Sequence, residues 1–583
     1  MLHTLTRSLR ENKGPALVTV LLSALEVVFE IVIPLFMSNL IDFGIEGGSM
    51  AAVWKFGAFL LLLAAFQLAT GVLAARIAAR ASVGFAANLR EDMFDNVQTF
   101  AFSNIDKFST ASIVTRLTTD TTNVQNAFQM LMRMAIRAPV MLIFSMIVSF
   151  RISHDISMTF LIILPILALA LFFIIRSVFP VFSRVFRTYD ELNNVVQENV
   201  RGIRVVKSFN QELHEIGKFG AISERIYKDF SKGERLITLN APLMQFCIYT
   251  CMIVISWLGA KAIIASGNDP ALGLTTGNLT ALITYTMQIL SSLMMLSMVF
   301  AMLTISLSSA RRIAEVLEER SDIPQPEQPV MTVRDGAVDF DHVSFVYASK
   351  ADKKVLDDID LHIRSGETIG IIGGTGASKS SLVQLIPRLY DVTGGKLTLG
   401  GVDVRDYDLD TLRGAVAMVL QKNELFSGTI AENLRWGNEN ATDEQLRHAC
   451  KLACADGFIS AMPDGYDTHI EQGGTNVSGG QKQRLCIARA LLKKPKVLIL
   501  DDSTSAVDTR TDAQIQQALS TYIPDTTKII IAQRISSVQN ADRIVVLDDG
   551  HIDAVGSHDE LLRTCEIYRE VYESQQKGGE DDA

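Results

Sequence analysis

The chain is 583 residues long, and 48% of its residues are hydrophobic whereas only 20% are charged. A mean hydropathy of +0.24 at this length indicates a substantial membrane-embedded part. Lysine and arginine number 54 against 64 aspartate and glutamate residues, and no basic stripe is interleaved with aromatics, which argues against a nucleic-acid partner. The six cysteines lack metal-ligand spacing, so we expect buried free thiols.

Six apolar segments precede residue 309, and each is long enough to cross a bilayer as a helix, which takes about 20 residues. They cover residues 16–41, 52–79, 135–150, 157–178, 239–264 and 279–305. The second and fourth connections between them are long, amphipathic and rich in basic residues. The positive-inside tendency therefore places both connections in the cytoplasm.

Two carboxylates interrupt the first apolar segment. Glu26 and Glu30 stand one turn apart on one helical face. A charge in mid-membrane costs roughly 3 kcal/mol or more, so such residues face a partner or a cavity. Two interpretations stay open: the carboxylates are paired or protonated inside the helix bundle, or they contact a cationic, amphipathic substrate.

The composition changes after the sixth segment. We predict a membrane domain over 1–318, a proline-containing linker over 319–336, a globular domain over 337–575 and an acidic tail over 576–583. Strands separated by helical stretches indicate an α/β fold with a mostly parallel sheet. The strands are expected at 338–347, 368–372, 396–401, 415–420, 496–502, 528–533 and 542–550.

A glycine-rich loop follows the strand at 368–372. Its sequence, GGTGASKSS at 373–381, matches the phosphate-binding pattern G-x-x-x-x-G-K-S/T except that Ser378 replaces the last glycine. In such a loop backbone N–H groups wrap the phosphates, Lys379 neutralises charge and the Ser380 hydroxyl ligates magnesium. If position 378 needs a left-handed backbone, serine costs about 1 to 2 kcal/mol, and if it is helical the substitution is nearly free.

Further motifs follow in a fixed order. Gln421 ends a strand, VSGGQ covers 477–481, Asp501 and Asp502 end the strand KVLILDD, and SAVD ends at Asp508. With Tyr347 upstream, this set resembles the ATP-binding cassette transporters, specifically exporter half-transporters, over essentially the whole chain. The resemblance implies an all-α, six-helix transmembrane domain of the type I exporter (type IV) fold, fused to a cytosolic α/β P-loop nucleotide-binding domain.

The resemblance also implies ATP and Mg²⁺ as cofactors and assigns roles to matching residues. Magnesium would be held by Ser380, Gln421 and, through water, Asp501. The 477–481 motif would face ATP held by a second cassette, and segments 112–120 and 201–209 would couple the membrane domain to the cassettes. The implied nucleotide-contacting residues are Tyr347, Gly373, Thr375, Gly376, Ala377, Ser378, Lys379, Ser380, Ser381, Gln421, Ser478, Gly479, Gly480, Gln481 and Asp508.

Two residues depart from the family pattern at hydrolytic positions. Asp502 stands where the family carries the glutamate that orients the attacking water, and Gln533 stands where a histidine contacts the γ-phosphate. Moving a catalytic carboxylate by about 1 Å can cost roughly a hundredfold in rate. Such paired changes mark the chain with a degenerate, ATP-holding site, whose partner half-transporter keeps the glutamate and histidine.

We therefore expect one subunit of a heterodimeric, ATP-driven exporter of amphipathic compounds, spanning the cell membrane among its lipids with a cytoplasmic cassette. A lipid flippase and an importer of metal-chelating small molecules on the same fold remain alternatives. From a different class, an ATP-gated channel or a sensory regulator would show a long regulatory insertion, and no such insertion stands out in the sequence.

Overall fold

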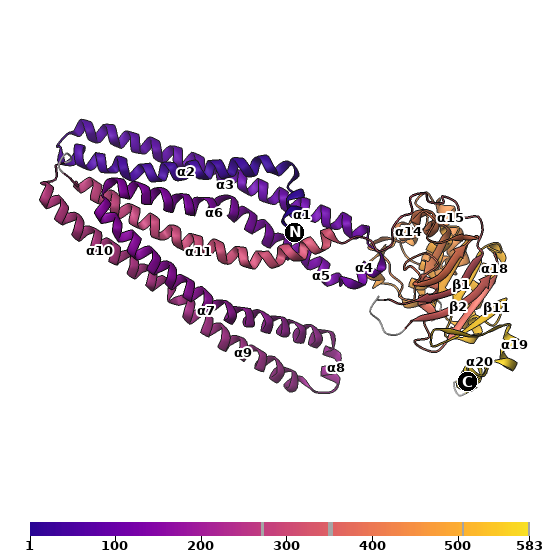
Figure 1. Ribbon diagram of the computed structural model, residues 1–583. Helices are drawn as coiled ribbons and strands as arrows, with labels where there is room; N and C mark the ends of the chain where they lie inside the picture. The colour runs from indigo at the N-terminus through magenta and orange to yellow at the C-terminus, as the bar shows by residue number, and fades with distance from the viewer. Residues whose placement is uncertain (270–272, 348–353, 504–505, 581–583) are drawn as a thin grey trace. The chain divides into compact units, whose positions relative to one another are not determined.

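A computed structural model describes residues 1–269, 273–347, 354–503 and 506–580 (Figure 1). The chain forms two compact units. The membrane unit comprises Met1–Gln98 and Thr110–Glu319, and the cassette unit comprises Thr99–Ser109 and Arg320–Ala583. The expected linker thus belongs to the cassette unit, where Val330 pairs with Tyr407 in an isolated β-bridge.

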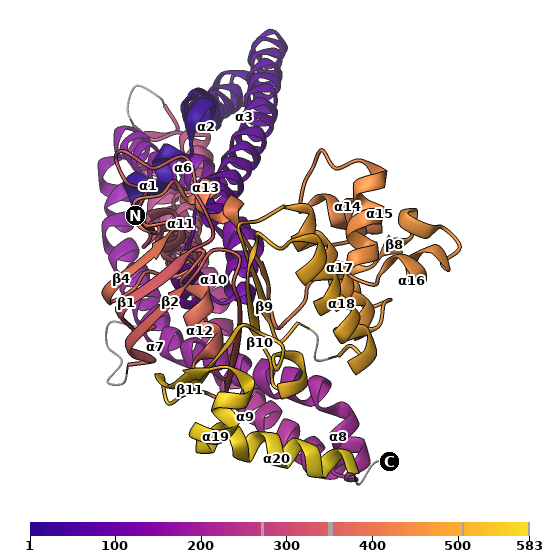
Figure 2. The same cartoon turned by 90° about the vertical axis from the view of Figure 1, so that its right-hand side faces the viewer.

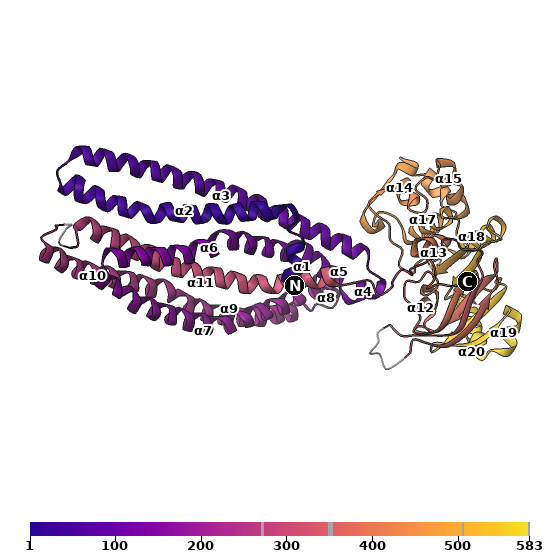
Figure 3. The same ribbon diagram turned by 45° about the horizontal axis from the view of Figure 1, so that its top comes forward.

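Long helices running side by side make up the membrane unit (Figures 1 and 3). Within the described residues, six stretches are long and apolar enough to cross a membrane, and each contains one predicted segment, which confirms their number and placement. The helices are α1 (Leu2–Arg7), α2 (Lys13–Asn39), α3 (Met50–Gln98), α5 (Thr110–Thr115), α6 (Thr121–Ile152), α7 (His154–Arg201), α8 (Ile203–Ser208), α9 (Glu212–Thr238), α10 (Asn240–Ser266) and α11 (Thr276–Glu318). A π-helical stretch, Leu40–Glu46, extends α2, and another, Arg116–Asp120, leads into α6.

Two of the apolar clusters between these helices include α11. Val27 and Ile31 of α2, Met141 of α6 and Tyr285 of α11 form one cluster, in which the Tyr285 hydroxyl donates to the Ile31 carbonyl at 2.6 Å. A second cluster joins α7, α10 and α11. Helix α11 therefore belongs to both clusters and ties the membrane unit together.

Two sheets organise the cassette. An antiparallel sheet has the order β2-β1-β4-β5, and a six-stranded sheet has the order β12-β11-β3-β10-β9-β6, in which only β12 is antiparallel to its neighbour. The strands are β1 (Val338–Phe345), β2 (Leu356–Ile363), β3 (Thr368–Gly373), β4 (Gly394–Leu399), β5 (Val402–Asp403), β6 (Val416–Val419), β9 (Val497–Asp501), β10 (Thr527–Ile531), β11 (Arg543–Asp548) and β12 (His551–Gly556), with a separate pair β7 (Gly428–Thr429) and β8 (His469–Ile470).

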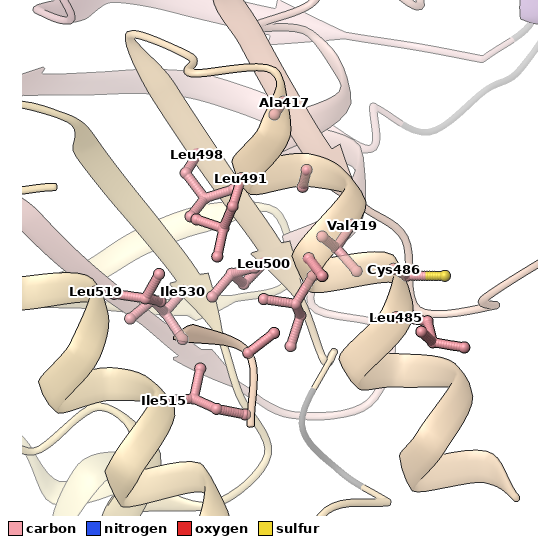
Figure 4. Packing of buried hydrophobic residues seen from close by; sticks show 14 of the residues in the cluster. Ala417, Val419, Leu485, Cys486, Leu491, Leu498, Leu500, Ile515, Leu519 and Ile530 are labelled. Carbon is pink, nitrogen blue, oxygen red and sulfur yellow. The ribbon is translucent and has the colours of Figure 1, made fainter. Parts of the chain in front are cut away.

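Helices cover the six-stranded sheet. Figure 2 shows α17 (Gly479–Leu492) and α18 (Thr509–Tyr522) beside β9 and β10. Leu485 of α17 and Ile515 of α18 belong to one buried cluster with Leu500 and Ile530 of the strands (Figure 4). The remaining cassette helices are α4 (Phe102–Lys107), α12 (Lys379–Gln384), α13 (Leu409–Ala415), α14 (Ile430–Arg435), α15 (Asp443–Leu452), α16 (Asp456–Ser460), α19 (His558–Thr564) and α20 (Glu566–Glu580).

This topology positions the site. The parallel strands β3, β6, β9 and β10 end at one edge of the sheet, and the phosphate loop, Gln421, Asp501 and Gln533 lie at or just after these ends. The carboxyl edge of an open α/β sheet is where such folds bind ligands.

Most expected elements are present. All seven predicted strands occur, but β1 and β4 belong to the antiparallel sheet, and β2, β5, β7, β8 and β12 were not predicted. All six cysteines are free; five are buried and Cys454 is intermediate. Helix α20 continues to Glu580, so the start of the expected tail is helical.

Candidate nucleotide-binding site

The phosphate loop has the backbone that its motif demands. Gly376 has φ +88°, and a Cβ there would meet no atom within 4 Å, whereas a Cβ on Gly373 would lie 2.2 Å from the Leu547 carbonyl oxygen. Thr375 is exposed and Ala377 is buried. Ser378 sits at φ +66°, ψ +21°, so position 378 is left-handed and the serine is strained.

Ser378→Gly should therefore raise the free energy of unfolding of the cassette by about 1 kcal/mol, because glycine adopts a left-handed backbone without Cβ strain. The measurement is thermal unfolding of the purified chain without nucleotide. Gly376→Ser is the matched reverse change at φ +88° and should lower the midpoint. An unchanged or lower midpoint for Ser378→Gly would contradict the strain argument.

Lys379 and Ser380 follow the loop at the start of α12. The Lys379 ammonium donates to the carbonyl oxygens of Gly373 and Gly374, at 2.8 Å each. Burial lowers the pKa of Lys379, while Asp501 and Asp502 oppose that shift. The Ser380 hydroxyl donates to Asp501 Oδ1 at 3.1 Å, which places the expected magnesium-ligating oxygen next to the expected magnesium-linked carboxylate. The donor set therefore fits a magnesium–phosphate ligand.

Asp502 and Gln533, the two residues that depart from the family pattern, contact each other in the structure. Gln533 Nε2 donates to Asp502 Oδ2 at 2.8 Å, and Gln421 Nε2 donates to the same oxygen at 3.4 Å. Asp502 is 9% exposed and has a left-handed backbone at φ +47°. Burial raises the pKa of Asp502, and the two amide donors oppose that rise. Burial is also the main cause of the raised pKa of Asp501.

An aromatic group borders the loop. The Tyr347 hydroxyl is 2.7 Å from Ser381 Oγ and 3.3 Å from Gln384 Oε1. The rings of Tyr347 and Tyr390 contact each other edge-on, with their centroids 5.1 Å apart. Tyr347 is 43% exposed, so ring surface remains for stacking on a base. Sequence reasoning missed Tyr390 because no motif marks it.

The 477–481 motif caps α17. The Ser478 hydroxyl accepts from the Gln481 N–H at 3.3 Å, and the Gln481 side chain accepts from the Ser478 N–H at 2.9 Å, a reciprocal capping box. Gly480 approaches the Ala506 backbone so closely that a Cβ would lie 2.8 Å from its oxygen. Asp508 caps α18 by accepting from the Thr511 N–H at 3.0 Å. Ser505 of the SAVD motif lies outside the described residues.

The segment Thr99–Ser109, which precedes the first expected coupling segment, groups with the cassette. Phe102 of α4 meets Tyr390 edge-on, and the Tyr390 hydroxyl donates to Asp106 at 2.8 Å. Residues 112–120 instead belong to the membrane unit, where Asp120 pairs with Arg312 of α11. The coupling role of 112–120 stays a prediction. The 201–209 segment contains α8 at the tip of α7 and α9, and its role stays a prediction.

The two membrane carboxylates have a partner that sequence reasoning missed. Arg137 of α6 places Nη1 at 2.7 Å from Glu26 and Nη2 at 2.6 Å from Glu30. Its signal was visible, because Arg137 lies inside the predicted third apolar segment. This geometry favours pairing within the bundle over a direct substrate contact.

Comparisons with known proteins agree with this architecture. Residues 16–294 match the ABC transporter transmembrane region, and residues 356–505 match the ABC transporter family. The uncharacterized ABC transporter ATP-binding protein YfiB of Bacillus subtilis is 35% identical over 96% of both chains, and YknU of the same organism is 34% identical over 84% of this chain and 82% of its own. A solved bacterial Atm1-family ABC exporter with ATP bound has a TM-score of 0.82 and 24% identity, covering 97% of this chain and 99% of its own.

Three findings identify the family of this chain: its six membrane-spanning stretches, its cassette with a phosphate loop, and relatives that match it over nearly their full length. It belongs to the ATP-binding cassette transporters, as an exporter-type half-transporter whose multi-pass transmembrane domain is fused to a cytosolic cassette that binds ATP with Mg²⁺ and hydrolyses it to drive transport.

Proposed function

We propose that this half-transporter is the ATP-holding subunit of a heterodimeric exporter of amphipathic compounds. Its own phosphate loop retains ATP at a weakly hydrolytic site. Its motif at 477–481 completes the hydrolytic site of a partner chain that carries the usual glutamate and histidine. Helix termini with free glycine N–H groups suit that role because they bind anions such as a γ-phosphate.

The observation that carries the proposal is the hydrogen bond from Gln533 Nε2 to Asp502 Oδ2 at 2.8 Å. A general base must accept a proton from the attacking water, and general-base assistance contributes about 10² to 10⁴ in rate. Asp502 is one methylene shorter than glutamate, and an amide already occupies one of its oxygens. Both effects lower the rate of hydrolysis. The groups that bind magnesium and phosphate are still present, on Lys379, Ser380 and Asp501.

The exporter-type architecture supports the direction of transport. Amphipathic cargo is proposed because such compounds could enter from the bilayer between the long apolar helices. Several large apolar side chains of the membrane-spanning helices are exposed, among them Leu61, Phe172 and Trp257. These surfaces suit contact with lipid acyl chains.

Purified alone in lipid, the chain should hydrolyse ATP barely above background, because two copies would pair two weakly hydrolytic sites. Co-expression with the partner half-transporter should restore turnover. The measurement is steady-state, vanadate-sensitive phosphate release. Robust hydrolysis by the chain alone would refute the heterodimer.

A further inference from the structure

The C-terminal helix α20 holds the segment that carries Gln533. Gln575 Nε2 donates to the backbone oxygen of Gln533 at 2.8 Å, and Gln575 Oε1 accepts the backbone N–H of Ile535 at 2.9 Å. A single side-chain amide thus satisfies one carbonyl and one N–H two residues apart. Among side chains only a primary amide has both a donor and an acceptor in this arrangement. The contact is therefore specific to the residue type.

Helix α20 is anchored independently of Gln575. Tyr568 is fully buried, and its hydroxyl lies 2.7 Å from His558 Nδ1. Val571 and Tyr572 pack against the same hydrophobic cluster that contains Ile535. Gln575 itself is exposed. Its two hydrogen bonds can therefore form or open without disturbing the buried packing of the helix.

The segment held by Gln575 leads directly to the ATP site. Gln533 reaches Asp502 with its side chain, and the Ser537 hydroxyl donates to Asp512 Oδ2 at 2.6 Å on α18. Residues 533–537 are thus fixed at three points: the acidic end of β9, helix α18 and helix α20. Of these, only the α20 contact acts on the backbone of residue 533 itself.

We propose that Gln575 is a positioning residue for the ATP site. Gln575 fixes the backbone at position 533. The C-terminal helix thereby determines how the side chain of residue 533 contacts Asp502 and the terminal phosphate of bound ATP. Gln575 touches neither nucleotide nor Asp502 and acts through Gln533. The inference rests on the proposed function in one respect, that position 533 faces the γ-phosphate.

The test uses the full-length chain in lipid nanodiscs and mant-ATP with Mg²⁺ as the probe. Gln575→Ala should release mant-ATP roughly 2- to 10-fold faster, the range expected for losing the one hydrogen bond, of its two, that holds the backbone of residue 533. Gln576→Ala is the matched control: it is the next residue on α20, of the same type, and donates to the Tyr572 hydroxyl at 3.0 Å. The control should leave the release rate unchanged. Equal rates for the two variants would overturn the proposal.

A second comparison distinguishes positioning from general support of the fold. Gln575→Glu keeps an acceptor for the Ile535 N–H but loses the donor to Gln533, so it should release mant-ATP as fast as Gln575→Ala does. In a Gln533→Ala background, Gln575→Ala should have no further effect, because the side chain through which it acts is gone. An equal acceleration in both backgrounds would refute the proposal.

These outcomes are separate from those of the heterodimer test. Release of mant-ATP reports retention at this chain's own phosphate loop, whereas steady-state hydrolysis reports the paired sites. A chain that hydrolyses ATP alone but still shows the Gln575 effect would refute only the asymmetric transporter. An asymmetric transporter without the Gln575 effect would refute only the positioning role.

Discussion

Changing the catalytic glutamate of the proposed partner chain to glutamine should lower ATP hydrolysis by the assembled heterodimer about 10² to 10⁴-fold, the usual contribution of a general base. Asp502→Asn in this chain should change the rate by no more than about twofold, because a carboxylate displaced by one methylene already contributes little. The hydrogen bond from the Gln533 amide to Asp502 Oδ2 weakens that contribution further, since it stabilises the charged carboxylate and so makes it a weaker base.

Steady-state phosphate release from the heterodimer, measured for each variant alone and combined, checks this expectation. Asp502→Glu with Gln533→His should recover hydrolysis at this chain's site only in part, because the partner's signature motif also shapes that site. Asp502→Glu alone should recover less, since the contact to the γ-phosphate is still missing. If Asp502→Asn proves as damaging as the change in the partner, both sites turn over and the asymmetry is wrong.

The fold was predictable where a pattern is local. Buried β-branched runs such as Val497–Asp501 identified the parallel strands with boundaries within a few residues. Strand β2, LDDIDLHI, was missed because the consecutive aspartates Asp357 and Asp358 interrupt its apolar–polar alternation, which only its second half keeps and which is typical of a strand with one exposed face. The membrane helices were predicted by apolar length alone, which suffices because backbone polar groups in lipid require a helix.

Candidate site residues were predicted where a short motif marks them, and the family resemblance related motifs that lie far apart in the sequence, such as those of Gln421 and Gln533. The loop from Gly373 to Ser381 and the strand end at Asp501 were found because their residues are neighbours in sequence. The contact of Gln575 with Gln533 was not predictable, because no motif relates these distant residues. Arg137 was visible as a charge inside an apolar segment, but the sequence does not show that it pairs with Glu26. The backbone conformation at Ser378 could not be predicted for a different reason. Serine fits a helical loop end at almost no cost and a left-handed one at a cost of only about 1 to 2 kcal/mol, so its presence favours neither strongly.

The ion-pair cluster in the membrane unit leads to a second large expected effect. Glu26, Glu30 and Arg137 have side chains 11%, 23% and 27% exposed, and they join α2 to α6. Gly71 of α3 approaches Glu26 so closely that a Cβ would lie 3.2 Å from its carboxylate oxygen. The cluster therefore lies where three helices meet, and its ion pairs join two of them, α2 and α6.

The double change Glu26→Gln, Glu30→Gln should destabilise the membrane unit by about 3 to 5 kcal/mol, because Arg137 is left partly buried without a counter-charge. Little folded protein should remain, and efflux of cationic and neutral dyes should fall equally. Adding Arg137→Gln removes the orphaned charge and should restore the amount of folded protein and the efflux of neutral dyes. Glu234→Gln, an exposed carboxylate on α9, is the surface control.

Two measurements separate pairing from substrate contact: the thermal midpoint of the purified protein, and dye efflux normalised to folded protein in membranes. If the cluster is a structural ion pair, the triple variant transports cationic and neutral dyes at the same ratio as the unmodified chain. If the double variant keeps its midpoint but loses only cationic dyes, the carboxylates act on the substrate, and pairing with Arg137 is not their main role. The ion-pair geometry favours the first outcome, because both carboxylates already use one oxygen on the same guanidinium.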